Sequence, residues 1–176
     1  MLDHVQKQLQ RIVFGVNISI TSRRVFEKRL LEGKLTRDEN PTSHFCVYFS
    51  AFDPKSQKVF IGFHKKSRLW LFNGGHMDKG ETPMEAIKRE MGEEWGMTLP
   101  VPKPSLLTLT KIEKPQIQIC QWHYDIWYFV AASQASFHPK KELLAKEFSE
   151  IGWKSIDEAG RLARDPSTLI ALRTIV

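Results

Sequence analysis

The chain has 176 residues, of which 41% are hydrophobic, and its 26 lysines and arginines against 20 aspartates and glutamates give a formal net charge of +6. This length allows one domain with a substantial core, and no apolar stretch approaches the roughly 18 to 20 residues of a membrane-spanning helix, so we expect no membrane partner. The basic residues are dispersed rather than arranged in a stripe with aromatic residues, which argues against a nucleic-acid partner and suits a small anionic one.

The N-terminal 40 residues are predicted to be helical. Apolar residues recur at helical spacing over 2–13 and 23–35, and the polar stretch 36–41 is typical of a turn. We expect residues 1–40 to form a helical extension packed on the core, serving as a packing or homodimerisation element, with one domain over 41–176.

The remaining chain alternates between strand and helix patterns. Strands are predicted around 44–51, 58–64, 69–72, 105–112, 117–132 and 151–154, with helices at 83–95, at 140–147 and at the C-terminus. Strands on both sides of a helix, with more helices near the end, predict an α/β fold with a mixed sheet between helical layers.

Cysteine usage bears on the compartment. Cys46 and Cys120 both lie in apolar stretches, so we expect them to be reduced and buried, with a disulfide as the lesser alternative. The charged, amphipathic N-terminus lacks the apolar segment of a signal peptide. A cytoplasmic location is therefore expected.

The helix over 83–95 carries clear end signals. Thr82 is expected as its N-cap, Pro83 suits the first helical position, and Glu85 completes a capping box. Gly96 is expected to end the helix in a left-handed conformation. Gly92, in the middle, would cost about 1 kcal/mol in a regular helix, and its presence has no explanation from the sequence.

Acidic residues crowd one side of this helix. At about 100° per residue, Glu90, Glu93 and Glu94 lie away from the apolar side, which should pack on the sheet. Desolvated like charges repel one another unless a cation lies among them. Hard divalent cations prefer such oxygen ligands and often act on phosphate groups. The alternative is an ordinary solvated acidic face, which would not require the surrounding glycines or Arg89 at these positions.

Residues 75–97, GHMDKGETPMEAIKREMGEEWGM, resemble the Nudix box, the signature of the Nudix hydrolase family. The pattern is glycine, five residues, glutamate, seven residues, arginine–glutamate, an aliphatic residue, one residue, glutamate–glutamate, one residue, glycine and an aliphatic residue. Every fixed position is met, with Met91 and Met97 in the aliphatic positions. One departure is Asn73, where many members have proline. The resemblance implies a Nudix-type α/β/α sandwich with a mixed sheet.

The resemblance also implies roles for individual residues. The metal ligands, for Mg²⁺ or Mn²⁺, would be the backbone carbonyl of Gly74 and the carboxylates of Glu90, Glu93 and Glu94. Glu81 and Arg89 would brace the loop and the helix. In some members the residue that matches Glu90 is also proposed as the base.

Further candidates lie outside the acidic helix. A fourth carboxylate often joins the site in this family, and Glu147 is our choice over Glu150, with surface charge as the alternative. The candidate phosphate-binding side chains are Lys65, Lys66, Arg68, His76 and His123. Strand alternation places His123 on a face that could point into the cleft, with an ordinary satisfied polar pair on a half-exposed strand as the alternative.

Together these features predict metal-dependent hydrolysis of a diphosphate bond in a nucleoside diphosphate derivative, by metal-activated water. The substrate stays open among nucleoside triphosphates, sugar nucleotides such as ADP-ribose, dinucleoside polyphosphates and capped RNA ends, with a small nucleotide favoured. The alternatives are a catalytically silent nucleotide sensor, which usually lacks some of the acids, and an RNA 5′-end pyrophosphohydrolase. An isoprenoid diphosphate isomerase would need a catalytic cysteine segment that is not evident here.

Overall fold

The computed structural model describes residues 3–112 and 119–175. Its centre is a seven-stranded sheet in the order β3-β2-β1-β6-β5, to which β4 adds by pairing with β1 and β7 by pairing with β2. The strands are β1 Ser43–Asp53, β2 Lys58–His64, β3 Leu69–Leu71, β4 Asn73–His76, β5 Leu106–Lys111, β6 Trp122–Ala131 and β7 Phe148–Ser155. Because β1 and β6 run parallel while the other pairings are antiparallel, the sheet is mixed, as predicted.

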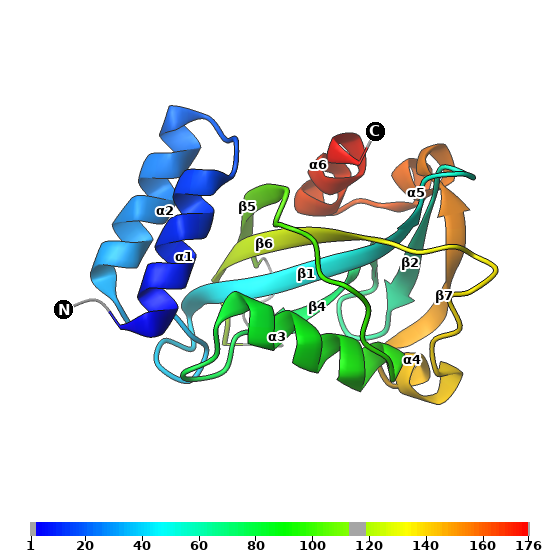
Figure 1. The fold of residues 1–176 in the computed structure, drawn as a ribbon, viewed down its shortest axis with the longest axis horizontal. Coiled ribbons are helices and arrows are strands. Elements are labelled where there is room, and N and C mark those ends of the chain that lie inside the picture. The colour runs from blue at the N-terminus through cyan, green and yellow to red at the C-terminus, as the bar shows by residue number, and fades with distance from the viewer. Residues whose placement is uncertain (1–2, 113–118, 176) are drawn as a thin grey trace.

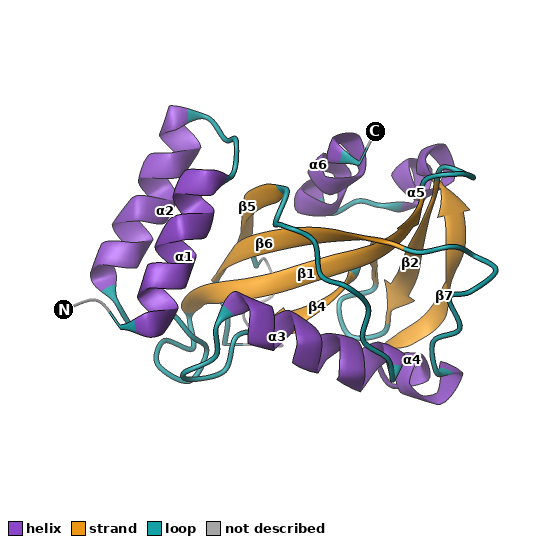
Figure 2. Cartoon of the chain, viewed as in Figure 1, coloured by secondary structure: helices purple, strands orange, loops and turns teal. Residues whose placement is uncertain are grey.

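Helices cover both faces of this sheet (Figure 1). They are α1 His4–Gly15, α2 Ile20–Glu32, α3 Pro83–Glu90, α4 Lys141–Glu147, α5 Ile156–Leu162 and α6 Pro166–Thr174. Figure 2 shows α3 and α4 on one side of the strands and α5 and α6 on the other, while α1 and α2 stand together at one end. The expected α/β/α sandwich is confirmed. Within the described residues, no helix combines the length and hydrophobicity needed to cross a membrane.

Strand β1 separates two apolar cores because its side chains alternate between the sheet faces. On one face Phe49 packs edge-on against Trp95, which follows α3, with ring centroids 4.7 Å apart. On the other face Tyr48 stacks on Trp127 of β6 at 4.8 Å, in the core that α5 and α6 cover. The Phe49–Trp95 contact therefore holds the end of α3 against the middle of the sheet.

The structure differs from the sequence prediction at the acidic helix. Helix α3 ends at Glu90 and continues as a π-helical turn, η1 Met91–Trp95, before Gly96 adopts the expected left-handed conformation with φ of 67°. Single π-helical turns within α-helices often mark functional sites. Gly92 lies in this turn, so the regular helix in which it would be unfavourable ends before it.

A second difference concerns the Gly74-Gly75 segment, which is strand β4 rather than a loop. Its backbone pairs with β1, Gly74 opposite Tyr48 and Gly75 opposite Val47. A side chain at Gly74 would collide with the carbonyl oxygen of Val47, so this strand position requires glycine. Strand β7 also begins at Phe148, three residues before the predicted start at 151.

The two N-terminal helices pack against the sheet. Phe26 of α2 contacts the rings of Phe45 and Tyr124, with centroids 6.1 and 5.3 Å away. The buried Arg29 of α2 donates to the carbonyl oxygen of Ser43, the first residue of β1, at 2.7 Å. The division of the chain at residue 40 stays a prediction.

Candidate active site

The acidic residues are positioned by a well-capped helix. The Thr82 hydroxyl accepts a hydrogen bond from the Glu85 N–H at 3.3 Å, and the Glu85 carboxylate accepts one from the Thr82 N–H at 2.8 Å. This capping box, with Pro83 after it, begins α3 close to strand β4. A side chain on Gly75 would collide with the Glu90 carboxylate, so the glycine lets the carboxylate lie directly against the strand.

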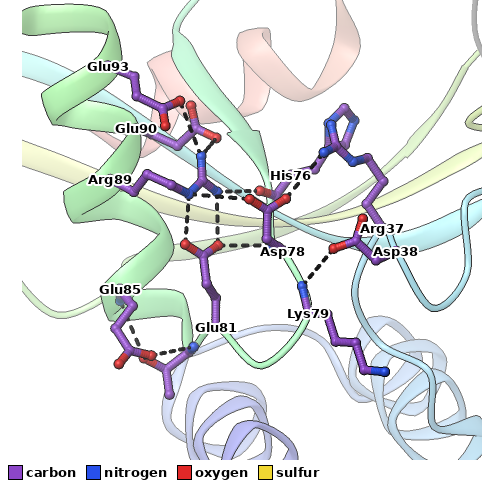
Figure 3. Close-up of polar contacts among 11 residues, drawn as sticks. Arg37, Asp38, His76, Asp78, Lys79, Glu81, Glu85, Arg89, Glu90 and Glu93 are labelled. Carbon is purple, nitrogen blue, oxygen red and sulfur yellow. Dashed lines mark hydrogen bonds and ion pairs between the residues drawn. The ribbon is translucent and has the colours of Figure 1, made fainter.

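Arg89 joins the loop before α3 to the acids on it (Figure 3). Its Nε and Nη2 donate to the two carboxylate oxygens of Glu81 at 2.7 and 2.9 Å. Its Nη2 also donates to the His76 carbonyl oxygen at 2.9 Å, and its Nη1 to Glu90 at 2.7 Å. Charge-assisted bonds of this kind are strong and directional. The hydrogen bonds from Arg89 hold the pKa of the Glu81 carboxyl below its usual value.

Two further carboxylates contact the Arg89 side of the site. Glu93, one turn along the helix, lies 3.4 Å from Nη1 of Arg89 and forms an ion pair with it. Asp78 donates its N–H to Glu81 at 2.9 Å and pairs with Arg37 at 3.3 Å (Figure 3). The loop between β4 and α3 is therefore held by ion pairs from both sides.

Glu94 is the most deeply buried acid of the cluster, 5% exposed. The Asn73 side-chain amide donates to one of its oxygens, and the Gly74 N–H donates to the other at 3.0 Å. The carbonyl of the same Asn73 amide accepts a hydrogen bond from the Trp95 indole at 3.0 Å. Asn73, which departs from the usual proline, thus holds the carboxylate in place and links it to the apolar core.

Glu90, Glu93 and Glu94 line one pocket of about 290 Å³. Its lining residues come from α3, η1 and α4: Glu90, Gly92, Glu93, Glu94, Leu143, Lys146 and Glu147. Burial raises the pKa of Glu90, and raises that of Glu94 well above its usual value. Such carboxylates are stabilised in their charged form by a cation, and an all-oxygen donor set fits a hard divalent ion.

Comparison with known proteins agrees with this geometry. The family model described as NUDIX domain matches residues 43–172. The chain belongs to the Nudix family. Nudix hydrolases act on phosphoanhydride bonds and generally use divalent metal ions, which places the chain among hydrolases of such anhydrides.

Individual relatives of this Nudix chain are distant or matched in part. It is 42% identical over 43 residues to an RNA pyrophosphohydrolase of Francisella tularensis subsp. mediasiatica, covering 24% of this chain and 28% of that protein. The dihydroneopterin triphosphate pyrophosphohydrolase of E. coli has a TM-score of 0.60 at 16% identity, covering 75% of this chain and 94% of its own. An Ap4A hydrolase of C. elegans has a TM-score of 0.60 at 14% identity, covering 74% and 93%. These structures share the Nudix fold.

The basic candidates before the Nudix box, Lys65, Lys66 and Arg68, do not line the acidic pocket. Lys65 donates its N–H to the Glu147 carbonyl oxygen at 2.8 Å, and its ammonium group hydrogen-bonds the Ala145 carbonyl. Arg68 lies over the Phe63 ring at 5.3 Å, while Lys66 is exposed. Among the described residues that line the acidic pocket, none is from this basic group, so its contact with phosphate stays a prediction.

The two candidate histidines of the Nudix chain point elsewhere. His123 is 5% exposed and packs against His76 and His44, with ring centroids 5.0 and 5.2 Å away. Burial lowers the pKa of His123 and of His76 to about 3, so both rings are neutral at ordinary pH. The expectation that this face of β6 opens into the acidic cleft was wrong, because the face is packed in the interior. That placement removes the argument for a phosphate contact by His123.

Proposed function

We propose that the protein hydrolyses a phosphoanhydride bond in a nucleoside diphosphate derivative, with Mg²⁺ or Mn²⁺ as cofactor. The observation that carries the proposal is the convergence of Glu90, Glu93, Glu94 and Glu147 on one pocket, with Arg89 bound to two of these acids. Carboxylates gathered around one cavity repel one another unless a cation lies among them. Membership of the Nudix family supports the same reaction.

The metal ligands in this proposal are the carboxylates of Glu90, Glu93 and Glu94 together with the Gly74 carbonyl. A divalent cation held there would neutralise the phosphate oxygens and lower the pKa of a water molecule. Arg89 and Glu81 hold Glu90 and the β4–α3 loop in a fixed position relative to each other, and the Asn73 amide orients Glu94. These supporting hydrogen bonds hold the ligands in place before substrate arrives.

Glu147 is our candidate to accept the proton of the attacking water. It lines the acidic pocket, and its side chain is half exposed, 3.7 Å from His64. A carboxylate with access to solvent can pass the proton on after hydrolysis, which a fully buried acid cannot do as readily. Glu90 is the alternative base, since it lies in the same pocket but is more deeply buried.

The substrate proposed is a small nucleotide. The pocket is walled by helix residues and carries Lys146 as a cation beside the acids. The RNA pyrophosphohydrolase similarity spans 43 residues, which supports the common chemistry more than an RNA substrate. The sensor alternative is weaker, because the box retains its full set of acids.

Metal removal tests the proposal directly. Hydrolysis of a panel of nucleoside triphosphates, sugar nucleotides and dinucleoside polyphosphates should stop in excess EDTA and return when Mg²⁺ or Mn²⁺ is added, because the acids require a cation to bind phosphate. Release of phosphate or of pyrophosphate would be measured. Turnover that survives chelation, or no turnover on the whole panel with either metal, would contradict it.

A further inference from the structure

A second group of metal-ligating side chains lies on the sheet face turned away from α3. His44 and Cys46 are two residues apart on β1 and point to the same face, while Phe45 between them packs in the core that contains the α3 residues. Strand pairing places His123 of β6 opposite His44, and His76 of β4 opposite Cys46. Three adjacent strands therefore bring three imidazoles and a thiol together.

The four side chains are close enough to share one ion. One ligand atom from each of His44, Cys46, His76 and His123 lies within 4.8 Å of all the others. The His44 and His76 ring centroids are 4.8 Å apart. His44, Cys46 and His123 are buried, at 0%, 1% and 5% exposure, so bulk water does not supply their hydrogen bonds. Buried polar side chains normally have a bonding partner.

His123 lacks such a partner among the described residues. Neither its Nδ1 nor its Nε2 has a hydrogen bond, although both atoms are buried. His44 does have a partner, because its Nδ1 lies 2.8 Å from the Asn40 carbonyl oxygen. A carbonyl oxygen only accepts hydrogen bonds, so the proton of the His44 ring is on Nδ1. The lone pair of His44 is then on Nε2, which lies 3.8 Å from the Cys120 sulfur. A backbone carbonyl that fixes the outer nitrogen is typical of metal-ligating histidines.

We propose that His44, Cys46, His76 and His123 bind one Zn²⁺ or a similar borderline-soft transition-metal ion. Three imidazole nitrogens and one thiolate are a tetrahedral donor set that Zn²⁺ accepts and that Mg²⁺, which prefers oxygen, does not. Binding releases the Cys46 thiol proton to solvent and leaves the metal with a thiolate ligand. Four protein ligands leave no open position, so the site is structural rather than catalytic.

The ion would tie β4, the strand that lies against Glu90 and Glu94, to the rest of the sheet. His76 supplies a ring nitrogen to one side and its carbonyl oxygen to Arg89 on the other. Gly74 and Gly75, just before it, lie against Glu94 and Glu90. Zinc at this position would therefore hold β4, and with it the backbone beside the acids, without contacting the substrate.

The full-length protein, stripped of metal and then loaded with Zn²⁺ or with Co²⁺ as a spectroscopic substitute, tests the site. We expect one tightly held ion per chain in the presence of excess Mg²⁺, a tetrahedral Co²⁺ spectrum with a thiolate charge-transfer band, and a melting temperature raised by about 5 °C or more. Cys46→Ser should lose the thiolate band and His123→Gln should lose tight binding. His138→Gln, which changes an exposed histidine outside the cluster, should bind as the parent does.

Circular dichroism of each metal-free variant separates loss of binding from loss of folding. Where a variant does not fold, the Co²⁺ spectrum of the parent protein decides: a tetrahedral spectrum with a thiolate band supports the site, and an octahedral spectrum without that band overturns it. The proposal is also overturned when the parent retains no ion after dialysis, or when folded Cys46→Ser and His123→Gln variants keep the parent's spectrum and affinity.

Discussion

Arg89 donates hydrogen bonds to Glu81, to Glu90 and to the His76 carbonyl, so one guanidinium group connects the loop, the helix and the strand that surround the acids. Its fork geometry matches a carboxylate bidentately, which a lysine could not reproduce. The Arg89–Glu93 ion pair joins residues four positions apart, a spacing that brings side chains together on a helix. The Asn73–Glu94 bond was not foreseeable, because the two residues are 21 positions apart and meet only when β4 lies beside η1.

The proposed metal ligands allow a test at single residues. Glu93→Gln or Glu94→Gln should lower turnover by at least ~10²-fold, because the neutral amide replaces a charged oxygen ligand. The measurement is the steady-state rate with saturating Mg²⁺, together with circular dichroism to verify folding. Glu142→Gln, on the first turn of α4 and outside the pocket lining, is the matched control and should keep the parent rate. A folded Glu93 or Glu94 variant with near-normal turnover would remove that residue from the metal site.

At the scale of elements, two helices of this chain begin with the same device. A capping box forms at Thr82–Glu85 before α3 and again at Ser155–Glu158 before α5, and both satisfy N–H groups that the first turn leaves free. The signal is local, so the sequence predicts the α3 cap correctly. The π-helical turn that follows α3 ends at Trp95, whose ring packs against Phe49, and a local pattern does not contain that contact.

The two caps provide a matched pair of substitutions. Thr82→Ala and Ser155→Ala should each lower the free energy of unfolding by about 1 kcal/mol, because each removes an N-cap acceptor. Only Thr82→Ala should also lower turnover, since α3 carries the acids. Urea unfolding and steady-state rates would be compared for both variants. Equal effects on turnover would show that the start of α3 does not control the site.

At the scale of the whole molecule, the sheet separates the acidic pocket from the histidine and cysteine cluster. The acids and their pocket lie on the α3 side, whereas the histidine and cysteine cluster lies on the opposite face of the same strands. The helices α1 and α2 stand at the sheet end, and we propose that residues 1–40 are an extension that stabilises the domain over 41–176. Arg29 connects the two parts through the carbonyl of Ser43, and its bonds to the carbonyls of Gly33 and Lys34 hold the end of the extension itself.

This connection can be removed without touching the pocket. Arg29→Met should lower the free energy of unfolding by about 3 kcal/mol, because three carbonyl oxygens lose a buried donor. Arg24→Met, at an exposed position of the same helix, should change it by less than about 0.5 kcal/mol. Denaturant unfolding measures both values, and turnover below the unfolding transition should stay at the parent level. Equal stability of the two variants would contradict the role given to Arg29.

The sequence by itself determined most of the helices and strands, the N-cap of α3 and the acidic motif, because each depends on spacing within a few turns of chain. It also indicated two reduced, buried cysteines, and both are free and buried. Tertiary structure alone decided which distant side chains meet. His44, His76 and His123 become neighbours through the register of three strands, and Asn73 reaches Glu94 through the packing of β4 beside η1. Strand register and packing across the sheet follow from the whole core, so no local pattern of residues encodes them.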